Sequence, residues 1–345
     1  MHNQKRLISV ISTLALAMMM FVCPMYAVSG SDHDVICSDV ALNETSLFSM
    51  RKVDDAVVYT MKRSEISDIS EAMSNNFFET KHELSMIGME DDEINGLTYA
   101  ELLQYATSKN ITASVSYIRT TTDGKQEYIS EGQAICESKA ANSGDKEKQS
   151  QETDEYMRIW HCVTHVGDGL MYFQTSARWL TMPKYRGVDS LGSCASYCSI
   201  IGGGVGYDMT AYIEYDCTVF TGIPGDYHVD EDLHEDYEGS FTILTDGAFY
   251  GSGFTFNLPN DVYSDGSPLL LYSDLVARFS YYGHVSLVDL ETYFNSKANY
   301  SHSYIYLGAT PSINFTDDDH TIGLDFSIIG AKEDRSTFLE FHYVP

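Results

Sequence analysis

The chain has 345 residues, with 21 Lys and Arg against 50 Asp and Glu, so its formal net charge at pH 7 is −29. This charge repels nucleic-acid phosphates and anionic lipid surfaces, which excludes nucleic-acid binding as a function and disfavours attachment to membranes. The acidic residues are spread over both halves of the chain. Their simplest role is to keep an exported protein soluble, and the functional alternative is the binding of Ca²⁺ or another cation.

Residues 1–30 have the pattern of a secretory signal peptide. Lys5 and Arg6 form a short positive segment, residues 7–22 are almost entirely apolar, and Pro24 and several small residues follow. The apolar run is short for a membrane-spanning helix, which needs about 20 residues. We therefore expect the signal to be removed and the mature chain to be secreted.

Six cysteines follow the signal, and an even number in an exported chain predicts up to three disulfides. The candidates are Cys37, Cys136, Cys162, Cys194, Cys198 and Cys217. On a single strand, Cys194 and Cys198 would lie about 13 Å apart, too far to bond each other. Cys162 and Cys217 are then their natural partners, and a metal site built from the thiols is the alternative.

Residues 31–136 are expected to form a small α+β region, which could be a removable pro-region. The Asp123-Gly124 pair is a strong hairpin signal, and Thr98 with Glu101 three residues later has the pattern of a helix capping box. In chain order we expect a strand at 56–61, a helix at 66–86, a helix beginning after Thr98, and a hairpin of strands 111–119 and 126–136.

A polar linker or mobile loop is expected at residues 137–157, between this region and the rest of the chain. Its segment 137–155 has no aromatic residue and only one β-branched residue, Thr153, so it cannot bury enough surface to fold. We place a domain boundary there. If the first region is a pro-region, this segment is the expected protease site.

Residues 158–345 are predicted to form an antiparallel β-sandwich, or flattened barrel, of about ten strands. The alternation of apolar and polar residues is longest in residues 205–220, where Ile213 and Cys217 share one face and Glu214 and Asp216 the other. We take this segment as the centre of a sheet. The fold class is therefore mainly β with a smaller α+β N-terminal part.

The acidic segment 226–238 is predicted to be a loop and is the candidate cation site. Its carboxylates suit Ca²⁺, and its imidazoles would add Zn²⁺ or Cu²⁺. The candidate ligands are Asp226, His228, Asp230, Asp232 and His234. Their spacing matches no EF-hand, and a solvated loop is the alternative. His161 and His165 are interpreted as packing or surface residues.

One aromatic-rich strand offers a possible binding face. Tyr300, His302, Tyr304 and Tyr306 alternate along it, and Tyr293-Phe294 lies just before it. A tyrosine ring combines apolar area with a polar tip, so an exposed row could bind a sugar or a protein partner. A packed core lined by these side chains is the alternative.

The chain contains no G-x-S-x-G elbow, no H-E-x-x-H helix and no P-loop, so we identify no catalytic residue. We expect a non-enzymatic binding or structural role outside the cell, with a protein or a carbohydrate as partner. A secreted hydrolase with a dispersed active site is the first alternative. A β-pore-forming protein is the second, because segments 170–182 and 205–220 exceed the about 9–11 residues that a membrane strand needs.

Overall fold

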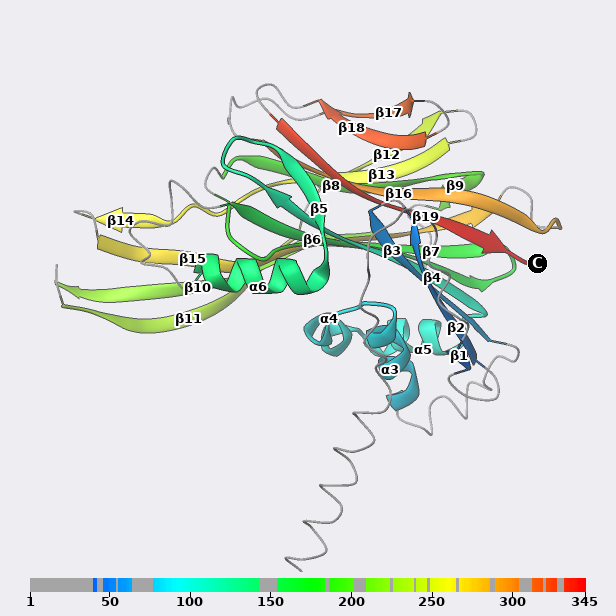
Figure 1. Ribbon diagram of the computed structural model, residues 1–345, viewed down its shortest axis with the longest axis horizontal. Helices are drawn as coiled ribbons and strands as arrows, with labels where there is room; N and C mark the ends of the chain where they lie inside the picture. Colours follow the sequence, from blue (N-terminus) through cyan, green and yellow to red (C-terminus); the bar gives the residue numbers. More distant parts are fainter. Residues whose placement is uncertain are drawn as a thin grey trace, which may run out of the picture. The chain divides into compact units, whose positions relative to one another are not determined.

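The computed structural model of the chain confirms a mostly antiparallel β fold (Figure 1). It describes residues 40–41, 46–53, 55–63, 77–142, 154–183, 186–201, 209–223, 226–238, 240–246, 249–264, 267–285, 289–303, 312–318, 321–327 and 332–345.

The larger sheet has 12 strands, with the order β1-β2-β3-β4-β6-β7-β15-β10-β11 and with β5, β9 and β14 paired beside this path. Its strands are β1 Val40–Ala41, β2 Ser46–Val53, β3 Ala56–Arg63, β4 Asn110–Thr120, β5 Gln126–Ile129, β6 Glu155–Gly167, β7 Leu170–Trp179, β9 Cys198–Ile201, β10 Thr210–Ile223, β11 Asp226–Glu238, β14 Val262–Ser264 and β15 Ser267–Val285.

The second sheet has five strands in the order β12-β13-β8-β16-β19, and β17 and β18 form a separate pair. These strands are β8 Val188–Ser196, β12 Ser240–Asp246, β13 Phe249–Asn257, β16 Thr292–Ser303, β17 Ser312–Asp318, β18 Thr321–Ser327 and β19 Lys332–Tyr343.

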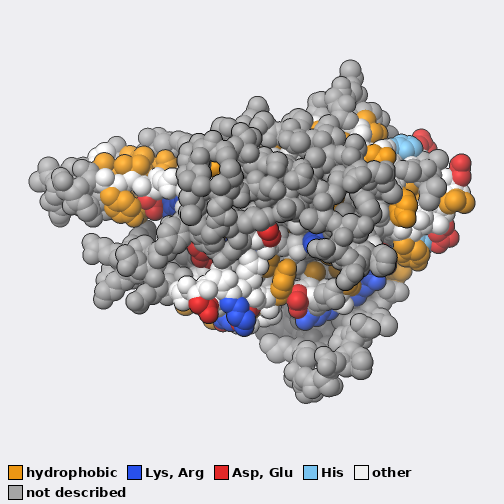
Figure 2. Space-filling view, turned by 90° about the horizontal axis from the view of Figure 1, so that it is seen from above, with side chains coloured by type: hydrophobic (Ala, Val, Ile, Leu, Met, Phe, Trp, Pro, Cys, Tyr) orange, Lys and Arg blue, Asp and Glu red, His pale blue; other side chains and the backbone are white. Residues whose placement is uncertain are grey.

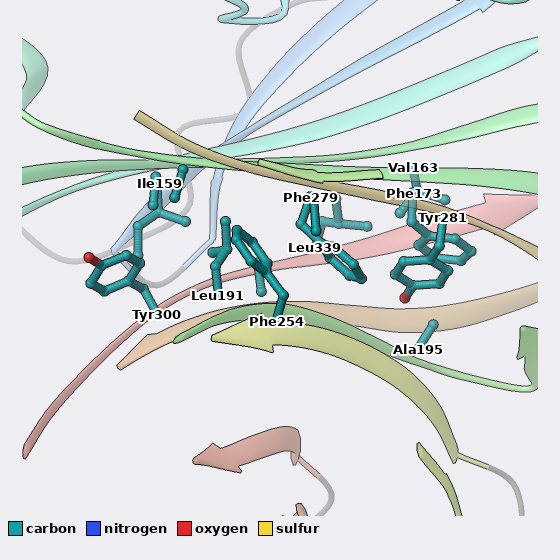
Figure 3. Close-up of a cluster of buried hydrophobic side chains, with 14 of the residues drawn as sticks. Ile159, Val163, Phe173, Leu191, Ala195, Phe254, Phe279, Tyr281, Tyr300 and Leu339 are labelled. Carbon is teal, nitrogen blue, oxygen red and sulfur yellow. The ribbon is translucent and has the colours of Figure 1, made fainter. Parts of the chain in front are cut away.

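The core lies between the two larger sheets, as expected for a sandwich (Figure 3). Because side chains alternate along a strand, each sheet turns every second residue toward the other. Phe173 and Phe279 come from the larger sheet, whereas Leu191, Phe254 and Leu339 come from the smaller one. All five are almost fully buried, and each such side chain stabilises the fold by about 1.5–3 kcal/mol.

The opposite face of the larger sheet is covered by α3 (Phe78–Met86), α4 (Asp91–Gly96) and α5 (Tyr99–Ala106). Leu84, Ile94 and Tyr105 pack there against Trp160 and Tyr172 of the sheet. The expected capping box at the start of α5 is confirmed. Thr98 Oγ1 accepts a hydrogen bond from the Glu101 amide at 3.3 Å, and the Thr98 amide donates to Glu101 Oε2 at 2.7 Å.

The predicted linker 137–157 overlaps the end of α6, at Asn142, and the start of β6, at Glu155, and the strands before and after it belong to one sheet. Strand β4 pairs with β6 along its whole length, from Asn110 opposite His165 to Thr120 opposite Glu155. Val35–Pro345 forms one compact unit. Removal of residues 31–136, which stays a prediction, would therefore take β1 to β5 out of the larger sheet.

Several expected elements differ in the structure. The predicted strand 126–136 ends at Ile129, and α6 (Glu131–Asn142) follows, because Ser130 Oγ accepts a hydrogen bond from the Gln133 amide at 3.3 Å and so starts a helix. Tyr197 separates β8 from β9, and its φ of 56° bends the chain from one sheet to the other.

The segment that the sequence placed at the centre of a sheet lies near its edge. Strand β10 pairs with β15 on one side and with the edge strand β11 on the other. Its apolar face is confirmed, because Ala211, Ile213 and Cys217 are buried. The predicted loop 226–238 is wrong, since these residues form β11. Alternation reveals a strand but not its neighbours, which explains the misplacement.

Candidate functional site: the outer face of β16 and β19

The five candidate cation ligands all lie in β11, where four of them pair with β10 and Asp230 falls at a register shift. A register shift between Val219 and Phe220 separates them into two sets, so that they are not evenly spaced along the ladder. Asp232 and His234 lie opposite Thr218 and Asp216, and Asp226 and His228 opposite Ile223 and Thr221. The side chains of β11 lie outside the described residues, so the cation site stays a prediction. Elsewhere, the described part of the chain contains no cluster of three His, Cys, Asp or Glu residues that could hold an ion.

The expected disulfides of the β region are not formed in the structure. Cys162, Cys194 and Cys198 carry free thiols, as does the exposed Cys136 of α6, and Cys37 lies outside the described residues. Cys162 packs under the helices, whereas Cys198 belongs to the core between the sheets, so the larger sheet itself separates them. Burial raises the pKa of Cys162 and of Cys194 to about 12.

The proposed aromatic face at Tyr300 and His302 is wrong, because both side chains are fully buried in the core. His302 Nδ1 lies 2.8 Å from Asp189 Oδ1, and the Tyr300 hydroxyl donates to the same carboxylate. Trp179 Nε1 donates to the Tyr300 hydroxyl at 2.9 Å. Tyr304 and Tyr306 lie outside the described residues.

This buried cluster continues to Arg335, whose guanidinium lies 4.7 Å from the centre of the Trp179 ring. Arg335 Nη2 donates to Thr120 Oγ1 at 2.7 Å, which ties the end of β19 to β4. Asp189 and His302 are residue types that can transfer protons, but neither has exposed surface. Their geometry serves to satisfy charges inside the core.

His161 and His165 are also buried, in agreement with a packing role. His161 Nδ1 lies 2.9 Å from Thr175 Oγ1, and Nε2 lies 2.7 Å from Ser296 Oγ, so both ring nitrogens have hydroxyl partners. Burial lowers the pKa of His161 to about 3 and that of His165 to about 4. Both imidazoles are therefore neutral at physiological pH.

A row of three arginines fastens α4 to the larger sheet. Arg158, Arg178 and Arg278 stand on β6, β7 and β15, and the carboxylates of Glu90, Asp92 and Glu93 meet them. Arg178 Nη1 lies 2.6 Å from Glu90 Oε2, and Arg158 Nη1 lies 3.6 Å from Glu93 Oε2.

The balance between burial and the arginine charges shifts the pKa values of Glu90 and Asp92 in opposite directions. Burial raises the pKa of Glu90 despite the lowering effect of Arg158 and Arg178. Burial acts in the same direction on Asp92, but the charge of Arg178 and its hydrogen bond outweigh it, so the pKa of Asp92 is lowered. The ion pairs of the row thus anchor α4 to the larger sheet, and α4 in turn covers the arginines.

A partly exposed face of mixed aromatic and polar character remains at the edge of the smaller sheet, with Tyr293 as its exposed aromatic residue. We call it the Tyr293 strip and define it by three cross-strand pairs of β16 and β19. The pairs are Tyr293 with His342, Asn295 with Glu340, and Lys297 with Phe338. Alternation creates this face, because the intervening residues Phe294, Leu339 and Phe341 point into the core.

The Tyr293 ring is 58% exposed and lies flat on the His342 ring, with 4.3 Å between centroids and 6° between planes. His342 Nε2 lies 2.6 Å from Glu291 Oε1, and Lys62 Nζ lies 3.4 Å from His342 Nδ1. These two contacts fix the imidazole, and the stack then holds the tyrosine ring in one orientation. Figure 2 shows hydrophobic and histidine side chains reaching the surface beside acidic ones at one end of the view.

The edge strand that carries half of the strip is itself anchored. The Tyr128 hydroxyl donates to the Ser336 carbonyl at 3.2 Å, and Asn110 Nδ2 donates to the His342 carbonyl at 2.8 Å. These side chains thus hydrogen-bond to backbone carbonyls that a free edge strand would offer to another chain. The outward face of β19, and not its edge, is therefore the surface open to a partner.

Sequence reasoning noticed Tyr293 but missed the rest of the strip. His342 and Glu340 become its neighbours only through the pairing of β16 with β19, whose partners in the chain are far apart. The sequence signal that could have found it is the alternation in residues 337–343, which marks Phe338, Glu340 and His342 as the outward face of a strand.

Comparisons with known proteins leave the family open. The chain matches no protein-family model and no curated protein. Among the solved structures that match is AvmM, described as catalysing macrocyclization in alchivemycin A biosynthesis, with 9% identity, 49% of this chain and 79% of that chain covered, and a TM-score of 0.20. At that score the likeness carries no argument about fold or activity. Separately, none of the helices that the structure describes combines the length and apolar character needed to cross a membrane.

Proposed function

We propose that this protein is an exported, non-enzymatic binding protein that holds a carbohydrate chain on the Tyr293 strip. The observation that carries the proposal is the exposed Tyr293 ring, held flat by its stack on His342. A fixed aromatic ring offers apolar area to the face of a sugar without the loss of side-chain entropy on binding.

The polar members of the strip supply hydrogen-bonding groups beside the ring. Asn295 has a donor and an acceptor, and Glu340 accepts, so sugar hydroxyls find both kinds of partner along the same face. The pair Asn295 and Glu340 is the next pair on this face along β16 and β19 after Tyr293 and His342. The ring and the polar groups therefore follow one another along one face of the sheet, where successive units of a glycan chain can contact them.

At three acid–base residues of the core, burial supports a binding role over catalysis. Asp189, His161 and His302 have no exposed surface. Export is supported by the pattern of residues 1–30, since a signal peptide would deliver the chain to the place where extracellular glycans occur.

The test is a screen of the mature protein against neutral and acidic oligosaccharides by glycan array, followed by calorimetry of the best ligand. We expect binding that Tyr293→Ala weakens at least about tenfold, the loss typical of a central aromatic contact. The matched control is Tyr263→Ala on β14, because Tyr263 is 57% exposed but belongs to the larger sheet. No binding to any glycan, or equal losses for the two variants, would sink the proposal.

A further inference from the structure

We infer that the glycan held on the Tyr293 strip is anionic, bearing carboxylate or sulfate groups; this inference rests on the proposed function. The strip lies on a chain whose net charge is −29. On such an acidic chain, the charged groups around Tyr293 include two lysines, Lys62 and Lys297.

Both carboxylates at the strip already face a cation or a hydrogen-bond donor. Glu291 Oε1 is 2.6 Å from His342 Nε2, and Glu340 Oε1 is 3.7 Å from an Arg51 guanidinium nitrogen. Glu340 is therefore paired with a positive charge, and the carboxylate of Glu291 is engaged by the imidazole. Asp289 is near Tyr293 in sequence, but burial and, to a smaller extent, the charge of Asp289 raise the pKa of Tyr343. Tyr343 points into the core on the opposite face of β19.

Two lysines lie at or beside the Tyr293 strip. Lys62 Nζ lies 3.4 Å from His342 Nδ1. Lys297 stands four residues from Tyr293 on the same face of β16, which corresponds to about 13 Å along a strand. Among the described residues, no ion pair between either lysine and a carboxylate is found within 4.0 Å.

The strip and its surroundings therefore combine an aromatic ring with two lysine ammonium groups. A neutral sugar would use the ring and the amide of Asn295 but neither charge. An acidic sugar chain would use all of these, with one anionic group near Lys62 and another near Lys297. Exposed charges interact within about 8–10 Å at physiological ionic strength, so each lysine acts on the sugar unit nearest to it.

The experiment compares three probes on the mature protein: a uronic-acid oligosaccharide, the same oligosaccharide with its carboxylates reduced to alcohols, and a sulfated oligosaccharide of similar length. We expect tighter binding of the anionic probes than of the reduced one, and weaker binding of the anionic probes as NaCl is raised. Preference between carboxylate and sulfate identifies the source of the anion.

Lys62→Gln and Lys297→Gln should each weaken binding of the preferred anionic probe by about two- to fivefold, as expected for exposed charge pairs, and should weaken binding of the reduced probe by a smaller factor. Lys139→Gln on the exposed side of α6 is the control and should change neither. Equal binding of the reduced and anionic probes, or lysine variants that behave like the control, would overturn the anionic preference while leaving the proposed function intact. Absence of binding to all three, together with a negative glycan screen, would instead remove the proposed function.

Discussion

Replacing Arg158 with Met should lower the free energy of unfolding by about 3–5 kcal/mol, because it removes one partner from a buried network of ion pairs. The Arg158 side chain is 2% exposed and that of Glu93, its partner at 3.6 Å, is 4% exposed. Methionine keeps most of the side-chain length but carries no charge. Glu93 would then retain Arg278 at 3.9 Å, and the Gly88 carbonyl would lose the Arg158 guanidinium as its donor.

The assay is equilibrium unfolding in urea, followed by tryptophan fluorescence, at pH 7. Adding Glu93→Gln to Arg158→Met should recover part of the loss, because the amide removes the carboxylate that has lost its partner. Arg51→Met is the matched control. Its partner Glu340 lies at 3.7 Å, but the two side chains are 48% and 44% exposed, so the expected change is below about 1 kcal/mol.

The reasoning would be refuted by a loss below about 1 kcal/mol for Arg158→Met. It would also be refuted if the double variant lost the sum of the two single losses. Either result would mean that α4 is held by its apolar contacts and that the arginine row adds little.

Three further predictions follow from the buried groups. Burial lowers the pKa of His161 to about 3, so below about pH 6.5 the unfolded chain binds a proton that the folded protein excludes. The free energy of unfolding should therefore fall with decreasing pH by up to about 1.4 kcal/mol per pH unit. Urea unfolding of His161→Asn should show a shallower fall of this free energy with pH. An unchanged slope in that variant would contradict this assignment. In the folded protein, the exposed Cys136 should react quickly with a thiol reagent, whereas Cys162, Cys194 and Cys198 should react only on unfolding; fast labelling of all four in mass spectrometry would count against the core described. Tyr300→Phe should lower the free energy of unfolding by about 1–3 kcal/mol, because Asp189 loses a buried hydrogen-bond donor. Tyr293→Ala should change it by less than about 0.5 kcal/mol. Thermal melting of both variants tests this, and a larger effect at Tyr293 would mean that the strip supports the fold.

Local patterns in the sequence were good guides to individual elements. The alternation in residues 205–220 marked the buried side of β10, with Ile213 and Cys217 facing inward. Thr98 and Glu101 marked the start of α5 because a capping box needs only four neighbouring residues. Such signals depend on residues close in the chain, where periodicity and hydrogen-bonding chemistry are visible.

Pairings between distant segments were beyond these patterns. Nothing in the sequence of β4 shows that it joins β6 across the polar segment, and nothing near Arg158 shows that Glu93 will meet it. The aromatic face was misassigned for a related reason: a row containing Tyr300 reads the same whether it faces solvent or the core. Only the position of the other sheet decides that Tyr300 is buried and Tyr293 exposed.

The most direct test of the central claim is hydrogen–deuterium exchange of the mature protein with and without the oligosaccharide that binds best. If the Tyr293 strip is the binding surface, slowed exchange will be confined to residues 291–297 and 338–343 and their immediate neighbours in β3, with β14 unchanged. Protection centred on any other part of the chain, with no change in β16 and β19, would contradict the account.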